Sequence, residues 1–101
     1  MSKLENFCNN LEDIREMYDF LGNKGIDELL GIIDIIKKKY DYGIISLDPQ
    51  YYEDSGEIAY IDIIFEKCNH IQWKVLELEV LALENITKGK IAVLCLEGLL
   101  R

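Results

Sequence analysis

Apolar side chains in the first part of the chain recur with the spacing of a helix. From Leu4 onward they follow alternating steps of three and four residues, which places them along one side of a helix. Ser2 and Glu5 have the spacing of a capping box at its start. We therefore predict a helix from about residue 3 to residue 21. The Gly-Asn-Lys-Gly sequence at residues 22–25 then ends it, because glycine and asparagine tolerate left-handed backbone at a helix end.

Residues 26–40 predict a second helix with a wide apolar surface. Acidic residues in its first turn and lysines at residues 37–39 in its last turn suit the helix dipole. Its apolar side chains form more than one stripe, so this helix must be covered on two sides. We expect the first helix on one side, in a helical hairpin, and a sheet or a second subunit on the other.

After Gly43 the apolar period shortens to that of a β-strand. Residues 71–84 fit both a strand and a helix, and we favour a strand because Glu77 and Glu79 would then share one solvated face. A helical tail is expected at residues 97–101. The remaining segments are predicted as strands at residues 42–47, 58–66 and 91–96, a polar loop at 48–57, and turns at 67–69 and 87–90.

These elements predict a single α+β domain over residues 1–101. An N-terminal helical hairpin of two helices is followed by a three- to four-stranded, mainly antiparallel sheet. A chain of 101 residues suffices for one core and not for two. Its apolar faces exceed what so small a domain can cover, so we expect a homodimer or a permanent partner. The residues placed at that partner surface are Ile32, Ile35, Tyr51, Tyr52 and Trp73.

The charge changes this picture most. The 11 basic and 19 acidic residues give a net charge of −8, and arginine occurs only at Arg15 and Arg101. Nucleic-acid binding draws its affinity from Lys and Arg on phosphates, so the charge argues against direct binding to nucleic acid or to an anionic membrane. The acidic side chains gather on the loop at residues 48–57 and at Glu77 and Glu79. This surplus predicts an acidic surface for a basic protein partner.

Cysteine usage and the N-terminus bear on location. The 3 cysteines are far apart in sequence and form no CxxC pair. The first residues of the sequence do not have the apolar character of a signal segment. We expect a cytoplasmic protein with reduced thiols. Abundant Glu and Lys with scarce Gln suit a thermophilic source, although the asparagines and cysteines argue the other way.

One pattern indicates catalysis. Asp62 on a predicted strand is followed ten residues later by Gln72-Trp73-Lys74 on the next, and this order resembles the PD-(D/E)xK nucleases. The resemblance implies that Asp62 and Gln72 bind Mg²⁺ while Lys74 orients the attacking water, with Glu28 as the acid of the preceding helix. Gln72 stands where the family usually has an acid. A chain of net charge −8 would repel nucleic acid, so this interpretation ranks second.

No other catalytic or cofactor motif is present. The sequence contains no GxSxG elbow, no GxGxxG and no GxxxxGK[ST] segment, so we expect no cofactor and no metal. The function expected is a small acidic, non-catalytic interaction module. It would be an accessory or regulatory subunit, such as an inhibitor or partner of a basic nucleic-acid-handling protein. The alternative is the metal-dependent nuclease-like domain.

Overall fold

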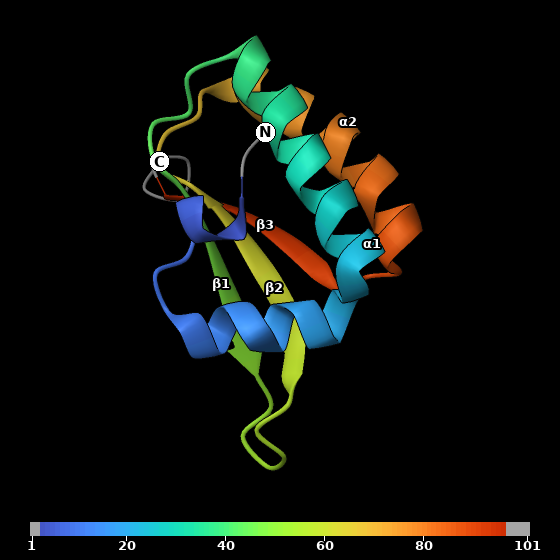
Figure 1. Ribbon diagram of the computed structural model, residues 1–101. Coiled ribbons are helices and arrows are strands. Elements are labelled where there is room, and N and C mark those ends of the chain that lie inside the picture. Colours follow the sequence, from blue (N-terminus) through green and yellow to red (C-terminus); the bar gives the residue numbers. More distant parts are fainter. Residues whose placement is uncertain (1–2, 97–101) are drawn as a thin grey trace.

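The computed structural model describes residues 3–96, which form an α+β fold with a three-stranded sheet (Figure 1). This confirms the α+β class of the prediction, but not its order of elements. The predicted helical tail at residues 97–101 and the capping role of Ser2 lie outside the described residues. The elements in chain order are a 3₁₀ turn at Leu4–Asn6, α1 (Leu11–Lys39), β1 (Ile45–Tyr51), β2 (Ile58–Phe65), α2 (His70–Thr87) and β3 (Ile91–Cys95).

The N-terminal region is one long bent helix, and the predicted helical hairpin is wrong. Helix α1 is interrupted at Gly22, which has a positive φ of 75°. The chain does break where the sequence predicts. However, a single non-helical residue redirects the helix without the loop that an antiparallel hairpin needs. The two halves of α1 therefore meet at an angle, as Figure 1 shows.

The start of α1 also differs from the prediction of residue 3. The Asn10 side chain accepts hydrogen bonds from the backbone N–H groups of Glu12 and Asp13, at 2.9 and 3.1 Å. This cap starts the helix at Leu11. The preceding segment leaves the helical path and buries Leu4 and Phe7 in the core. Their helical spacing in the sequence thus reflects burial rather than one continuous helix.

The sheet is mixed rather than mainly antiparallel. Its strand order is β1-β2-β3, with β1 and β2 antiparallel and β2 and β3 parallel. A parallel pair needs a crossover connection, which α2 supplies. The predicted strand at residues 71–84 is accordingly wrong, and the helical alternative is right. An Asn69–Gln72 capping box opens α2, and Leu76, Val80 and Leu83 form its buried face.

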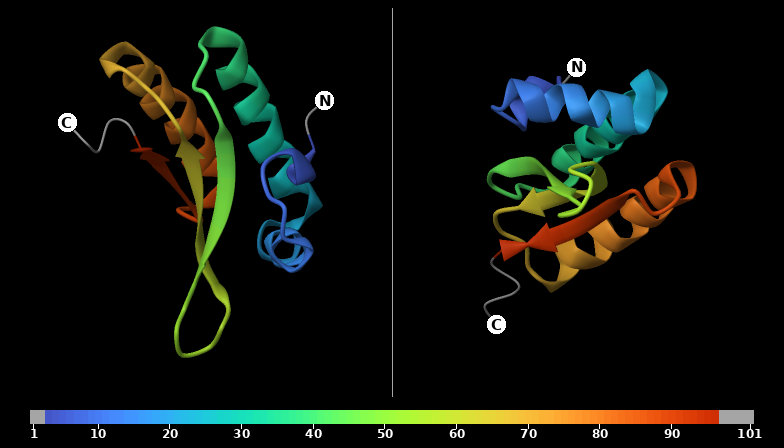
Figure 2. Two further views of the ribbon diagram at one scale, coloured as in Figure 1. Left: turned by 90° about the vertical axis from the view of Figure 1, so that its left-hand side faces the viewer. Right: turned by 90° about the horizontal axis from the view of Figure 1, so that it is seen from below.

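Both helices lie on one face of the sheet, and the core fills the space between the two layers (Figure 2). Helix α1 contacts β1 and β2, whereas α2 contacts α1 and β3. Strand residues Leu47, Ile61 and Ile63 point into this core and are almost fully buried. Within residues 3–96 no helix or strand covers the opposite, open face of the sheet (Figure 2).

Cys68 and Cys95 form a disulfide, with their Cα atoms 6.4 Å apart. The structure therefore pairs two of the cysteines that the sequence predicts as reduced thiols. The parallel return of β3 places Cys95 beside Phe65, at the end of β2, so residues distant in sequence become neighbours. Cys8 remains a free thiol. Within the described part of the chain, no helix has the length and apolar character needed to cross a membrane.

Candidate partner-binding surfaces

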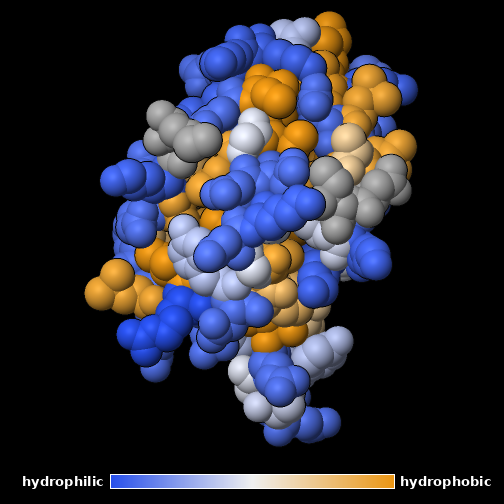
Figure 3. All heavy atoms as spheres, turned by 45° about the vertical axis from the view of Figure 1, so that its right-hand side comes forward, coloured by the Kyte–Doolittle hydropathy of each residue, from blue (hydrophilic) through white to orange (hydrophobic). Residues whose placement is uncertain are grey.

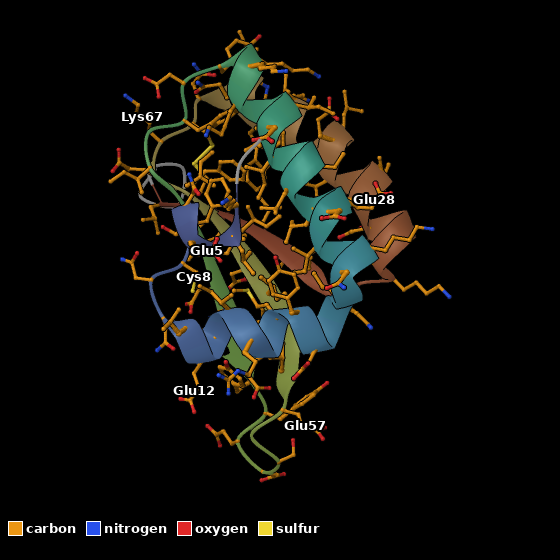
Figure 4. All side chains as sticks on the ribbon, viewed as in Figure 1. Glu5, Cys8, Glu12, Glu28, Glu57 and Lys67 are labelled. Atoms are coloured by element: carbon orange, nitrogen blue, oxygen red, sulfur yellow. A yellow bond between two sulfur atoms is a disulfide. The ribbon has the colours of Figure 1, made fainter. Side chains whose placement is uncertain are left out.

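The nuclease-like residues do not share one site. Asp62 alternates with Ile61 and Ile63, which face the helices, so its carboxylate points to the open face of the sheet. Gln72 and Lys74 lie in the first turns of α2, on the other face, and not on a strand as the pattern requires. Glu28 projects from the C-terminal half of α1 (Figure 4). The sheet thus separates Asp62 from the other candidates.

Gln72 already has a structural role. The backbone N–H of Asn69 donates to Gln72 Oε1 at 2.7 Å, and Gln72 Nε2 donates to the carbonyl of Asp41 at 3.0 Å. In return, the backbone N–H of Gln72 donates to Asn69 Oδ1 at 2.9 Å. The side chain therefore caps α2 and links it to the end of α1, which leaves its amide engaged within the fold.

The open face of the sheet holds two acidic side chains directly opposite each other. Asp48 of β1 pairs in register with Asp62 of β2, and Gln50 Nε2 donates to Asp48 Oδ2 at 2.9 Å. Burial raises the pKa of Asp62, the charge of Asp48 raises it further, and a hydrogen bond from Gln50 opposes the change. Among the described residues, no cluster of three or more His, Cys, Asp or Glu side chains could hold a metal ion.

The residues predicted for a partner surface lie on three separate elements. Ile35 lies on α1 and has 44% of its surface exposed. Tyr51 and Tyr52 lie beside the hairpin loop and are 39 and 58% exposed. Ile32 and Trp73 are half-buried and pack against the core. Apolar side chains are nonetheless exposed on the helical side of the molecule, where orange atoms lie among polar ones in Figure 3.

An acidic end forms where the β1–β2 hairpin meets the N-terminal half of α1. The Tyr51 hydroxyl donates to Asp13 Oδ1 at 2.6 Å, and Glu16 lies close enough to raise the pKa of Tyr51. Burial is the largest cause of that rise, followed by the Asp13 hydrogen bond. Glu12 and Glu57 lie at this same end in Figure 4. We define the acidic end as Glu12, Asp13, Glu16, Glu53, Asp54 and Glu57.

Sequence reasoning found only the hairpin half of this surface. The loop charges Glu53, Asp54 and Glu57 stand together in the sequence. The α1 charges lie some forty residues away, and the Tyr51–Asp13 hydrogen bond, between residues 38 apart, joins them to the hairpin. Periodicity in the sequence carries no signal for such a contact.

Two lysines of the run at the end of α1 contact neighbouring elements. Lys39 pairs with Glu79 of α2, and the Lys37 ammonium lies 5.5 Å from the centre of the Phe7 ring. Nearby, Lys67 Nζ lies 3.7 Å from Asp41 Oδ2. The Lys37 and Lys39 contacts tie α1 to its neighbours, and the Lys67–Asp41 pair links the segment after α1 to the β2–α2 turn. The sequence predicted only a helix-dipole role for the lysine run.

A groove separates α2 from β3. It has a volume of about 220 Å³, and its lining combines apolar side chains with two glutamates. The lining residues are Trp73, Leu76, Glu77, Val80, Leu81, Glu84 and Val93. Trp73 therefore lies at a concave surface, as a partner contact would require, although it is half-buried within its own chain.

Comparison with known proteins adds no identity. The chain matches no protein-family model, and neither curated proteins nor solved structures give a significant match.

Proposed function

We propose that this protein is a non-catalytic interaction module whose acidic end binds a basic segment of a partner protein. The observation that carries the proposal is the Tyr51–Asp13 hydrogen bond, since it holds the hairpin against α1 and so gathers carboxylates from both elements. The exposed ring of Tyr52 lies beside them and offers contact area at low entropic cost. An accessory or regulatory subunit would use such a surface to steer and bind a Lys- and Arg-rich partner.

The nuclease-like alternative has no comparable support. Its acid and its lysine lie on opposite faces of the sheet, and its glutamine caps a helix. The net charge of −8 also repels nucleic acid.

The test measures binding of a Lys- and Arg-rich twelve-residue peptide by fluorescence anisotropy. In the hairpin variant, Glu53→Gln, Asp54→Asn and Glu57→Gln are combined. This variant should lose three exposed ion pairs with the peptide, each worth about 0.5 kcal/mol. Its affinity should therefore fall about tenfold at low salt. The peptide with every basic residue replaced by glutamine is expected not to bind.

The control is a variant with the same change in net charge elsewhere, Glu5→Gln, Asp27→Asn and Glu28→Gln. It should lose less than about twofold, because those positions lie outside the acidic end. An equal loss in the hairpin and control variants would mean that only net charge matters, and would reject a defined binding end.

A further inference from the structure

The helical layer is wider than the sheet that it covers. Two helices packed side by side have axes about 9 Å apart and together span roughly 20 Å. Three strands spaced about 4.8 Å apart span roughly 14 Å, so the helical layer exceeds the sheet by about one strand. Because α1 covers β1 and β2 while α2 contacts β3, we place the excess width at the β3 edge.

The groove between α2 and β3 occupies this place. Trp73, Leu76 and Val80 form its α2 wall, and Val93 forms its β3 wall. Leu81 lines it as well, although 58% of the Leu81 surface is exposed. In a wider sheet, the inward side chains of a fourth strand would fill this space beneath α2.

The outer edge of β3 presents backbone N–H and C=O groups that can pair with another strand. The Ile61 N–H donates to the Lys90 carbonyl at 2.9 Å, which in a parallel ladder directs the peptide groups of Ala92 and Leu94 toward β2. The groups of Ile91 and Val93 then point to the free edge. Strand β3 carries no charge and no proline between Ile91 and Cys95, so nothing on it blocks another strand.

We propose that β3 and the α2–β3 groove bind an extended segment of a partner protein, which adds to the sheet as a fourth strand. Its alternate apolar side chains enter the groove, while the Lys or Arg side chains between them point to the open face of the sheet and are attracted by the net charge of −8. Glu77 and Glu84 at the groove disfavour an acidic occupant. Charge complementarity selects this occupant over a second copy. A second copy would bring the same glutamates and a net charge of −8 to the interface.

Two ten-residue peptides of identical composition test the proposal, one with alternating Val and Lys and one with valines and lysines in separate blocks. Anisotropy should show at least about tenfold tighter binding of the alternating peptide. Amide hydrogen exchange should slow at Ile91 and Val93 on binding, because they gain partners, while Ala92 and Leu94 change little. Failure of the alternating peptide to bind, or equal binding of the block peptide, would overturn the proposal.

Matched variants localise the site. Leu81→Lys places a charge in the groove and should weaken the alternating peptide at least about tenfold. Leu78→Lys, on the same helix, 72% exposed and outside the groove, should change it less than about twofold. Equal losses would show charge repulsion only and contradict the proposed site. A concentration-dependent dimer that protects the Val93 amide without peptide would overturn the choice of occupant.

This inference does not depend on the acidic end. The hairpin variant at Glu53, Asp54 and Glu57 should keep the slowed exchange at Val93 when the alternating peptide is added. Loss of that protection in the hairpin variant alone would contradict a separate β3 site.

Discussion

The two edge strands of the sheet, β1 and β3, differ in how far their outer backbone groups are covered or blocked. At the β1 edge, the Leu47 N–H donates to the Phe7 carbonyl at 3.0 Å, so the N-terminal segment covers that position. Pro49 lies two residues further along β1 and has the same orientation as Leu47, but proline has no N–H to donate to another strand. A register shift at Gln50 and Tyr51 then ends regular pairing. Within residues 3–96, β3 has none of these devices.

This difference between the two edges agrees with the proposed binding of a partner strand at β3. Exposed strand edges promote unwanted pairing, and natural proteins block them with proline, bulges, charges or covering segments. The β1 edge uses several of these. Among the residues that the structure describes, the β3 edge is apolar, and its short length, Ile91–Cys95, is all that limits pairing. Selective blocking of one edge suits a protein whose other edge binds a partner.

The largest expected effect concerns how β3 is held. Within residues 3–96, strand β3 has one neighbouring strand, and its end is tied to the β2–α2 turn by the Cys68–Cys95 disulfide, which closes a loop between residues 27 apart in sequence. Chain entropy alone assigns such a loop about 3.5 kcal/mol. Cys68→Ala with Cys95→Ala should therefore lower the free energy of unfolding by roughly that amount, measured by urea denaturation without reductant.

Reductant is the matching control. Dithiothreitol should destabilise the wild type and leave the double variant unchanged, whereas Cys8→Ser should behave as the wild type does. Amide exchange should rise more in β3 than in β1 on reduction. Native protein that alkylates at all three cysteines would contradict the disulfide.

The sequence predicted the individual strands and the helix break better than the way these elements are arranged in space. The strand at residues 58–66 and the break at Gly22 follow from period and from glycine chemistry, which are local. The helix at His70–Thr87 was missed because Glu77 and Glu79 suit a solvated strand face as well as a helix. The parallel β3, the disulfide and the Tyr51–Asp13 contact join residues far apart in sequence, and no local pattern encodes them.

A smaller effect tests how the β1 side is tied to α1. Tyr51→Phe removes the hydroxyl that donates to Asp13, and should cost about 1 kcal/mol at neutral pH for a half-exposed, charge-assisted bond. Tyr52→Phe is the control, because no hydrogen bond of the Tyr52 hydroxyl occurs among the described residues. Equal stability of the wild type and Tyr51→Phe in urea would show that the contact contributes nothing.

The pH dependence of this variant has a definite sign. Burial and the Asp13 carboxylate raise the pKa of Tyr51, so the folded state keeps its proton where the unfolded chain has lost it. Stability should therefore fall as pH rises above the ordinary tyrosine value of about 10. Tyr51→Phe should lose less stability there, and the gap between the two proteins should narrow.

The smallest effect concerns the open face, where Asp62 has Asp48 beside it on β1 and Ala92 beside it on β3. Because burial and then Asp48 raise the pKa of Asp62, ionisation of Asp62 disfavours the folded state. Asp62→Asn should thus stabilise the protein by about 0.5 kcal/mol at neutral pH. The gain should vanish as pH falls below the ordinary Asp value of about 3.9, where both states bind the proton.

Variants at the two residues that pair with Asp62 distinguish the β1 side of β2 from its β3 side. Asp48→Asn should give part of the same gain, and the Asp48→Asn, Asp62→Asn pair should be less than additive, because one repulsion is removed twice. Ala92→Asp should instead create on the β3 side the repulsion that the β1 side already has, and should destabilise the protein at neutral pH. A loss of stability in Asp62→Asn, read from urea denaturation across pH, would mean that Gln50 favours the ionised carboxylate more than burial and Asp48 oppose it.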